Sequence, residues 1–153
     1  MIIVKNKQRK IFLETQKIKN SAQQILHFLN YEDFDLGILF TTPAHIQEYN
    51  HEYRTSNKPT DILSFSPHPS LKPGSRLVVI DEEEKNLGDL ILCPQYIVEN
   101  LEQWNMSFEE RLEVLLVHGV CHLLGYDHEL DEDYEIMKKE EERILRSLRE
   151  DNS

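Results

Sequence analysis

The sequence has few cysteines and no long apolar segment. Only two of its 153 residues are cysteines, Cys93 and Cys121, which are too few for a disulfide framework. Both lie among apolar residues, so we expect buried free thiols in a reducing compartment. No apolar run approaches the roughly 18 residues of a membrane-spanning helix. The segment Met1–Lys5 also lacks the apolar core of a signal peptide. These absences predict a cytoplasmic protein.

Basic side chains are also scarce. The chain has 17 Lys and Arg against 28 Asp and Glu, which gives a formal net charge of −11. Phosphates are repelled by such a surface, so the charge excludes a protein that coats nucleic acid indiscriminately. The charge is uneven, however, because residues 1–20 hold six basic side chains and a single acidic one, Glu14. The basic ones are Lys5, Lys7, Arg9, Lys10, Lys17 and Lys19. A role in nucleic-acid chemistry therefore requires a local positive region.

Length and patterning predict one α+β domain over residues 1–153, with the last few residues disordered. Apolar and β-branched runs predict strands at 2–4, 36–40, 62–65, 77–80 and 87–92. Helical spacing and caps predict helices at 14–29, 43–53, 94–103, 108–124 and 129–149. Residues 11–13 fit either a hairpin strand or the approach to the first helix. The expected architecture is a mixed β-sheet packed with about five helices.

Two of these helices begin with strong local signals. Thr42 is an N-cap residue followed by Pro43 at the first helical position. Ser107 is followed three residues later by Glu110, which is the spacing of a capping box. The helix that begins after Ser107 leads into the most informative segment of the chain.

That segment is HGVCHLLGYDH, residues 118–128. His118 and His122 are four residues apart, so a helix places both imidazoles on one face, as two ligands of one metal ion require. Gly125 is typical of a helix end, and the turn after it can bring His128 back to the other two. Three imidazoles leave a fourth coordination position for water. This is the coordination of a catalytic zinc site rather than a closed structural one.

The spacing also resembles that of the metzincin peptidases, with one departure. Those enzymes carry a glutamate directly after the first histidine, and it serves as general base. This chain has Gly119 at that position. A peptidase that uses this glutamate is therefore disfavoured.

The neighbouring residues have less certain roles. Cys121 lies three residues from His118, but a small buried residue is the better interpretation, because a thiolate ligand would close the site. Asp127 is either a hydrogen-bond partner of a ligand imidazole or a surface acid or N-cap beside His128. The remaining histidines are interpreted as ordinary polar or core residues, namely His27, His45, His51 and His68.

Two further blocks accompany the histidine segment. Tyr53 and Arg54 are followed by PTDILSF at residues 59–65, and LGDL occupies residues 87–90. Together with the pattern H-G-x-x-H-L-x-G-Y-D-H, these blocks resemble the YbeY family of bacterial endoribonucleases, also called rRNA maturation factors. The blocks occur in the family's order. Cys121 stands where the family usually has Leu, and Ser66 where Pro commonly follows the Phe, but neither change removes a ligand.

The resemblance implies a zincin-like α+β fold and one Zn²⁺ per chain, held by His118, His122 and His128. It also implies that Arg54 is the functional arginine. The implied reaction is cleavage of single-stranded RNA, in maturation of the 3′ end of 16S rRNA and in ribosome quality control. The implied partners are ribosomal RNA and the ribosome, or its small subunit with assembly proteins. The resemblance implies no interaction with a membrane or with DNA.

For metal-assisted hydrolysis of a phosphodiester, the chain offers a phosphate ligand but no obvious general base. The guanidinium of Arg54 is permanently charged and can bind two phosphate oxygens, although a structural salt bridge is the simpler interpretation without the resemblance. Tyr53 and Phe65 are candidates for stacking on unpaired bases, and Phe65 also fits the core. Further candidates for contacts with the RNA backbone are Lys58, Lys72, Arg76 and the amino-terminal lysines.

Two other functions remain open. One is a zincin-type peptidase or amidase, which Gly119 disfavours. The other is a non-catalytic assembly factor in which zinc holds the last two helices together, which the open coordination position disfavours. Imidazole ligands also suit copper, nickel and iron, so the ligand set does not define the metal.

Overall fold

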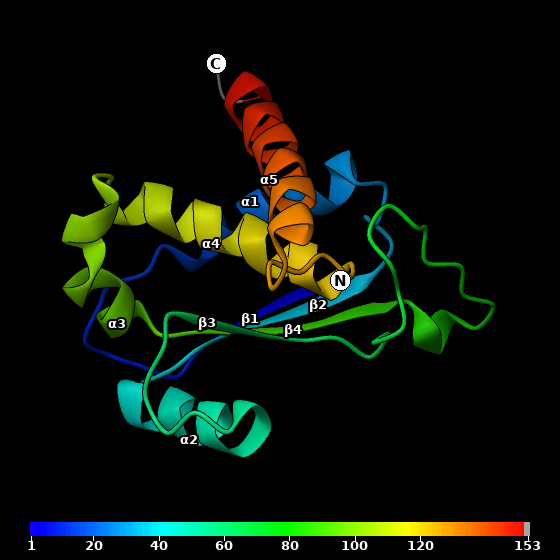
Figure 1. Cartoon of the computed structure of the whole chain (residues 1–153). Helices are drawn as coiled ribbons and strands as arrows, with labels where there is room; N and C mark the ends of the chain where they lie inside the picture. The colour runs from blue at the N-terminus through cyan, green and yellow to red at the C-terminus, as the bar shows by residue number, and fades with distance from the viewer. Residues whose placement is uncertain (152–153) are drawn as a thin grey trace.

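The computed structural model describes residues 1–151 and is built on a four-stranded sheet (Figure 1). The disorder predicted at the end of the chain concerns residues 152–153, which lie outside the described residues. The strands are β1 (Ile2–Asn6), β2 (Asp35–Phe40), β3 (Ile62–Phe65) and β4 (Asn86–Leu92). They lie in the order β1-β2-β4-β3, with β1, β2 and β4 parallel and β3 antiparallel to β4. The predicted mixed sheet is therefore confirmed, and β3 forms one of its edges.

The helices cover the two faces of the sheet unequally (Figure 1). One face packs against α1 (Thr15–Phe28) and α4 (Phe108–Leu123), with α5 (Asp131–Asp151) lying over these two helices, and the other face meets α2 (Pro43–Arg54). The main core lies on the three-helix side and includes the fully buried side chains Phe40, Leu36, Leu90, Leu116 and Met137. A smaller cluster under α2 contains Ile46, Leu63, Ile91 and Cys93. The α+β class predicted from the sequence is confirmed.

The local signals that start and end these helices have the predicted effect. The Thr42 side chain accepts a hydrogen bond from the backbone N–H of His45, and Ser107 and Glu110 form a complete capping box. Residues 11–13 lead into α1 and do not form a hairpin strand. Both cysteines are buried free thiols, as predicted. Within residues 1–151, no helix combines the length and the apolar character needed to cross a membrane.

The strand predicted at residues 77–80 is wrong. The backbone N–H of Leu77 donates to the Tyr31 hydroxyl at 3.0 Å, and Val78 and Ile80 are 85% and 95% exposed. Just before this segment, the Arg76 guanidinium donates to the carbonyls of residues 29 and 30 at the end of α1 and covers the Tyr31 ring. The start of the segment is thus anchored next to the end of α1, and residues 77–80 pair with no strand of the described sheet. Its β-branched composition alone does not produce a strand.

The helix predicted at residues 94–103 is interrupted. α3 (Pro94–Glu99) ends before Asn100, and a short 3₁₀ helix follows at Leu101–Trp104. The Asn100 backbone N–H and its side-chain amide both donate to the Tyr96 carbonyl, at 3.1 and 2.8 Å. Asn100 leaves the helical conformation with φ −111° and ψ 13°, and its side chain caps the end of α3.

α4 approaches the sheet most closely at Gly119. A Cβ atom at this position would lie 2.8 Å from Leu90 Cδ2 and 2.9 Å from Ile62 Cδ1, which is closer than normal van der Waals contact. Position 119 therefore faces β3 and β4. A glutamate at this position would require the Leu90 and Ile62 side chains to shift.

Gly125 ends α4 with φ +96°, and a Cβ atom there would overlap the carbonyl oxygen of Leu71. Gly74 also has a positive φ of +80°, but its Cβ would have no neighbour within 4 Å. We therefore expect Gly125→Ala to lower the free energy of unfolding by about 2 kcal/mol or more, and Gly74→Ala by about 1 kcal/mol, the cost of backbone strain alone. Urea unfolding of both variants measures the difference. Equal losses would contradict a contribution from the Leu71 contact.

Candidate functional site

The structure brings together the three histidines that the spacing singled out. His118 and His122 lie one turn apart on α4, and the chain after Gly125 returns to place His128 beside them. The His118 and His122 Nε2 atoms are 3.1 Å apart, and one nitrogen from each of the three rings lies within 4.8 Å of the others. The ring centroids are separated by 4.5 to 5.6 Å. Three imidazoles therefore converge on one point.

The δ nitrogens of His118 and His122 are already occupied by other partners. His118 Nδ1 lies 3.1 Å from the Glu141 carboxylate on α5, and His122 Nδ1 lies 2.9 Å from the Tyr126 carbonyl. Both partners are acceptors, so the δ nitrogens of neutral rings carry the protons and the ε nitrogens carry the lone pairs. Two lone pairs 3.1 Å apart repel each other unless a cation lies between them.

This arrangement fits a metal ion. Zinc–nitrogen bonds of about 2.0–2.1 Å in tetrahedral geometry place two ligand nitrogens roughly 3.3 Å apart, close to the observed separation. Burial, with smaller effects from neighbouring His118 and His128, lowers the pKa of His122 to about 4. The ring is therefore neutral at pH 7, as a metal ligand must be. His118, His122 and His128 can hold one ion.

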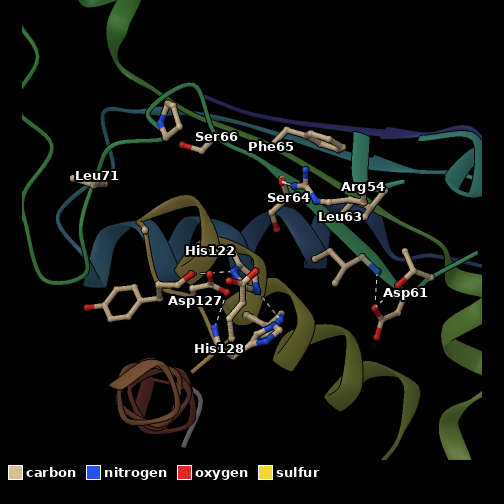
Figure 2. Close-up of a pocket in the computed structure, with 17 residues that line it drawn as sticks. Arg54, Asp61, Leu63, Ser64, Phe65, Ser66, Leu71, His122, Asp127 and His128 are labelled. Atoms are coloured by element: carbon tan, nitrogen blue, oxygen red, sulfur yellow. Dashed lines mark hydrogen bonds between the residues drawn. The ribbon is translucent and has the colours of Figure 1, made fainter. Parts of the chain in front are cut away.

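The histidines form one wall of an open cleft of about 750 Å³. Figure 2 shows Arg54 and Ser64 on one side of this cleft and His122, Asp127 and His128 on the other. Arg54 Nη2 donates to the Ser64 carbonyl at 2.7 Å, on the outer edge of β3. Within residues 1–151 Arg54 forms no ion pair, so the salt-bridge alternative does not hold. Its charge is available to the cleft.

Glu141 is the functional candidate that sequence reasoning missed. The apolar stripe of α5 contains Met137, Ile144 and Leu148, all buried, and Glu141 occupies the same stripe. An acidic residue within an otherwise apolar helix stripe is the sequence pattern that could have indicated a functional carboxylate here. Asp127, considered instead as the partner of an imidazole, accepts a hydrogen bond from the His128 backbone N–H at 2.7 Å.

Tyr126 connects the same turn to α5. Its side chain is buried, and its hydroxyl donates to Glu140 at 3.0 Å. Since the Tyr126 carbonyl accepts from His122, this one residue fixes both the turn and a ligand ring. α5 therefore holds the site through two adjacent carboxylates, Glu140 and Glu141.

Other candidates from the sequence lie outside the cleft. Arg76 is bound to the end of α1, and neither Lys58 nor Lys72 lines the cleft. The basic residue Lys5 lies on β1, at the sheet edge opposite β3. Cys121 is a buried free thiol, and its sulfur is not among the donor atoms that converge with the three imidazoles. The remaining histidines also lie outside, namely His27, His45, His51 and His68.

The fold and the cleft define an α+β protein with a three-histidine site able to hold a metal, facing an arginine on an open cleft. A family model described as Endoribonuclease YbeY matches residues 3–149. The chain belongs to this family, as its three sequence blocks predicted, and endoribonuclease is the class of enzyme for which the family is named.

Relatives named Endoribonuclease YbeY match the chain almost end to end. The protein from Caldicellulosiruptor bescii is 35% identical, over 96% of this chain and 96% of its own length. The protein from Homo sapiens is 33% identical, over 96% of this chain and 87% of its own length. The solution structure of TM1509 from Thermotoga maritima has a TM-score of 0.58 at 24% identity, covering 99% of this chain and 93% of that chain. That likeness confirms the fold.

We expect Glu141→Gln to weaken binding of a divalent ion to the three imidazoles by about 10- to 100-fold, because the charge that supports His118 is lost while the shape is retained. Glu142→Gln is the matched control, since this neighbouring carboxylate is exposed. Competition between each protein and a chelator for Zn²⁺ or Co²⁺ measures the dissociation constants. Equal constants for the two variants would mean that Glu141 does not support the site.

Proposed function

We propose that this chain is a zinc-dependent endoribonuclease that cleaves single-stranded ribosomal RNA in the cytoplasm. Its reaction contributes to maturation of the 16S rRNA 3′ end and to ribosome quality control, with the small subunit and its assembly proteins as partners. The observation that carries the proposal is the convergence of three imidazoles on a cleft that also contains Arg54. The family name and the match over residues 3–149 support RNA as substrate and residues 1–153 as one catalytic domain.

In this reaction the side chains of the cleft bind the metal ion, orient its ligands and offset the charge of the phosphate. His118, His122 and His128 hold the ion, and Glu141 and the Tyr126 carbonyl keep the first two rings in the binding tautomer. When bound, a divalent ion supplies Lewis acidity that activates water and offsets the charge of the phosphate. Arg54 faces the histidines and binds phosphate oxygens through its two-pronged guanidinium.

The cleft also limits the choice of proton acceptor. Of the carboxylates that line it, Asp61 is paired with Arg111 at 3.4 Å and accepts from the Ile62 N–H. Asp127 and Glu129 remain, and both are exposed at the mouth of the cleft. Either carboxylate, or the phosphate itself, accepts the proton of the attacking water.

Two alternatives have less support. A peptidase of the metzincin kind lacks its glutamate, and Gly119 packs against the sheet where that side chain would be. A purely structural zinc site is usually enclosed by four protein ligands, whereas these three imidazoles border an open cleft.

Cleavage of single-stranded RNA by the zinc-loaded protein tests the proposal. We expect about one zinc per chain, loss of activity on chelation, and at least about 10²-fold slower cleavage by His118→Ala, which also loses metal. His51→Ala is the control, because this exposed histidine on α2 lies outside the cleft. Intact RNA together with hydrolysis of unfolded protein would favour the peptidase instead.

Arg54→Ala separates binding of metal from binding of phosphate. We expect this variant to retain the ion and to cleave RNA about 10²- to 10³-fold more slowly, because one charge opposite the phosphate is removed. Arg9→Ala removes an exposed charge outside the cleft and should change cleavage little. Full activity of Arg54→Ala in a steady-state assay would exclude Arg54 from the mechanism.

A further inference from the structure

A second hollow lies on the α2 face of the sheet and meets the cleft at Phe65. It has a volume of about 550 Å³, and its floor includes Ile3, Gly37 and Asp89 on β1, β2 and β4. α2 is the helix that covers this face, and Figure 1 shows it under one part of the sheet. The hollow lies over the part of this sheet face that α2 leaves uncovered, and Tyr53 of α2 borders it. We call it the sheet groove.

One side of the sheet groove is a row of aromatic rings. Tyr49 and Tyr53 are one helical turn apart on α2, with nearly parallel rings whose centroids lie 6.4 Å apart. Tyr53 then meets Phe65 edge to face at 5.3 Å. Tyr53 is 53% exposed, and no hydroxyl partner holds either tyrosine within residues 1–151. Ring surface therefore remains open to a ligand.

The row of rings is continuous with the catalytic cleft. Phe65 lines both hollows, and the Arg54 guanidinium lies 5.1 Å above its ring. Tyr53 and Arg54 are adjacent at the end of α2, so the aromatic groove and the phosphate ligand share one structural support. An RNA strand with one phosphate bound at Arg54 can therefore place its neighbouring nucleotide beside Tyr53.

We propose that the sheet groove binds unstacked bases of the RNA strand next to the scissile phosphate. This inference rests on the proposed function. Tyr53 is the platform on which a base stacks, with Tyr49 extending it and Phe65 linking it to the cleft. Bases in a duplex are already stacked and paired, so the platform accepts single strands and excludes duplexes.

The charges in the sheet groove orient the strand. Asp89 is exposed on the floor, where its carboxylate repels phosphates but accepts hydrogen bonds from base amino groups. Lys5 lies at the β1 side and has no partner within residues 1–151, while Arg54 lies at the cleft side. Bases are thus directed inward to the floor, and the backbone passes between cations.

Steady-state cleavage of a short single-stranded RNA by the zinc-loaded protein tests the proposal. We expect Tyr53→Ala to raise KM about tenfold, within the 5- to 150-fold range of one stacked base, with kcat little changed. Tyr53→Phe should behave like the native protein, because the ring is kept. Tyr134→Ala is the matched control, since Tyr134 is 49% exposed on α5, outside the groove.

Substrates that lack one base identify the nucleotide concerned. Removing the base that stacks should raise KM for the native protein but not for Tyr53→Ala, because the two losses concern one contact. An unchanged KM in Tyr53→Ala overturns the proposal and leaves the groove to a protein partner. A loss in Tyr53→Phe equal to that in Tyr53→Ala also overturns it, since the hydroxyl and not the ring would then act.

Photo-crosslinking keeps this test separate from the proposed function. If the native protein cleaves no RNA, the proposed function fails, and 4-thiouridine RNA then tests the groove by binding alone. Crosslinks to Tyr49, Tyr53 or Phe65 support the groove, and crosslinks elsewhere overturn it. The thermal unfolding temperature of Tyr53→Ala checks that this variant is folded at the assay temperature, because its ring contacts with Tyr49 and Phe65 are lost.

Discussion

The close approach of α4 to β3 and β4 is the constraint on which the rest of the site depends. Gly119 allows the helix to touch Leu90 and Ile62, which brings His118 and His122 to the same cleft as the outer edge of β3. That edge binds Arg54 through the Ser64 carbonyl. A larger residue at position 119 would disturb the packing of Leu90 and Ile62 directly beneath the two imidazoles, so the packing of α4 and the position of the site are coupled at this glycine.

α5 carries a carboxylate within its apolar face, and this carboxylate orients one of the three converging imidazoles. Its buried stripe is interrupted by Glu141, and a partly buried carboxylate is unfavourable unless it is paired. The pairing partner is His118, and Glu140 binds Tyr126, whose carbonyl orients His122. The last helix therefore supports two imidazole rings on α4. The two α5 carboxylates that reach this site, Glu140 and Glu141, are both engaged with protein groups.

The acidic character of the chain has a local meaning in this YbeY-family protein. A net charge of −11 opposes general attraction to RNA, and the basic residues do not gather around the cleft as the sequence had indicated. The cleft itself carries Arg54 and three imidazoles able to hold a cation. Recognition through aromatic rings is compatible with this charge, because stacking on a base requires no general positive field. Under the proposed function, specificity depends on the exposed bases and on the ribosomal context.

The sequence by itself determined most elements and the convergence of the histidines, because i,i+4 spacing, a helix-ending glycine and N-caps act within a few residues. It misjudged residues 77–80, where the Tyr31 hydroxyl after α1 binds Leu77, and residues 94–103, where α3 ends at Asn100. Only the tertiary structure decided that Glu141, and not Asp127, supports His118. It also decided that Tyr53 and Phe65 line a second groove and that Phe65 borders the cleft as well. These features join segments distant in sequence, and their contacts depend on how the helices pack against the sheet.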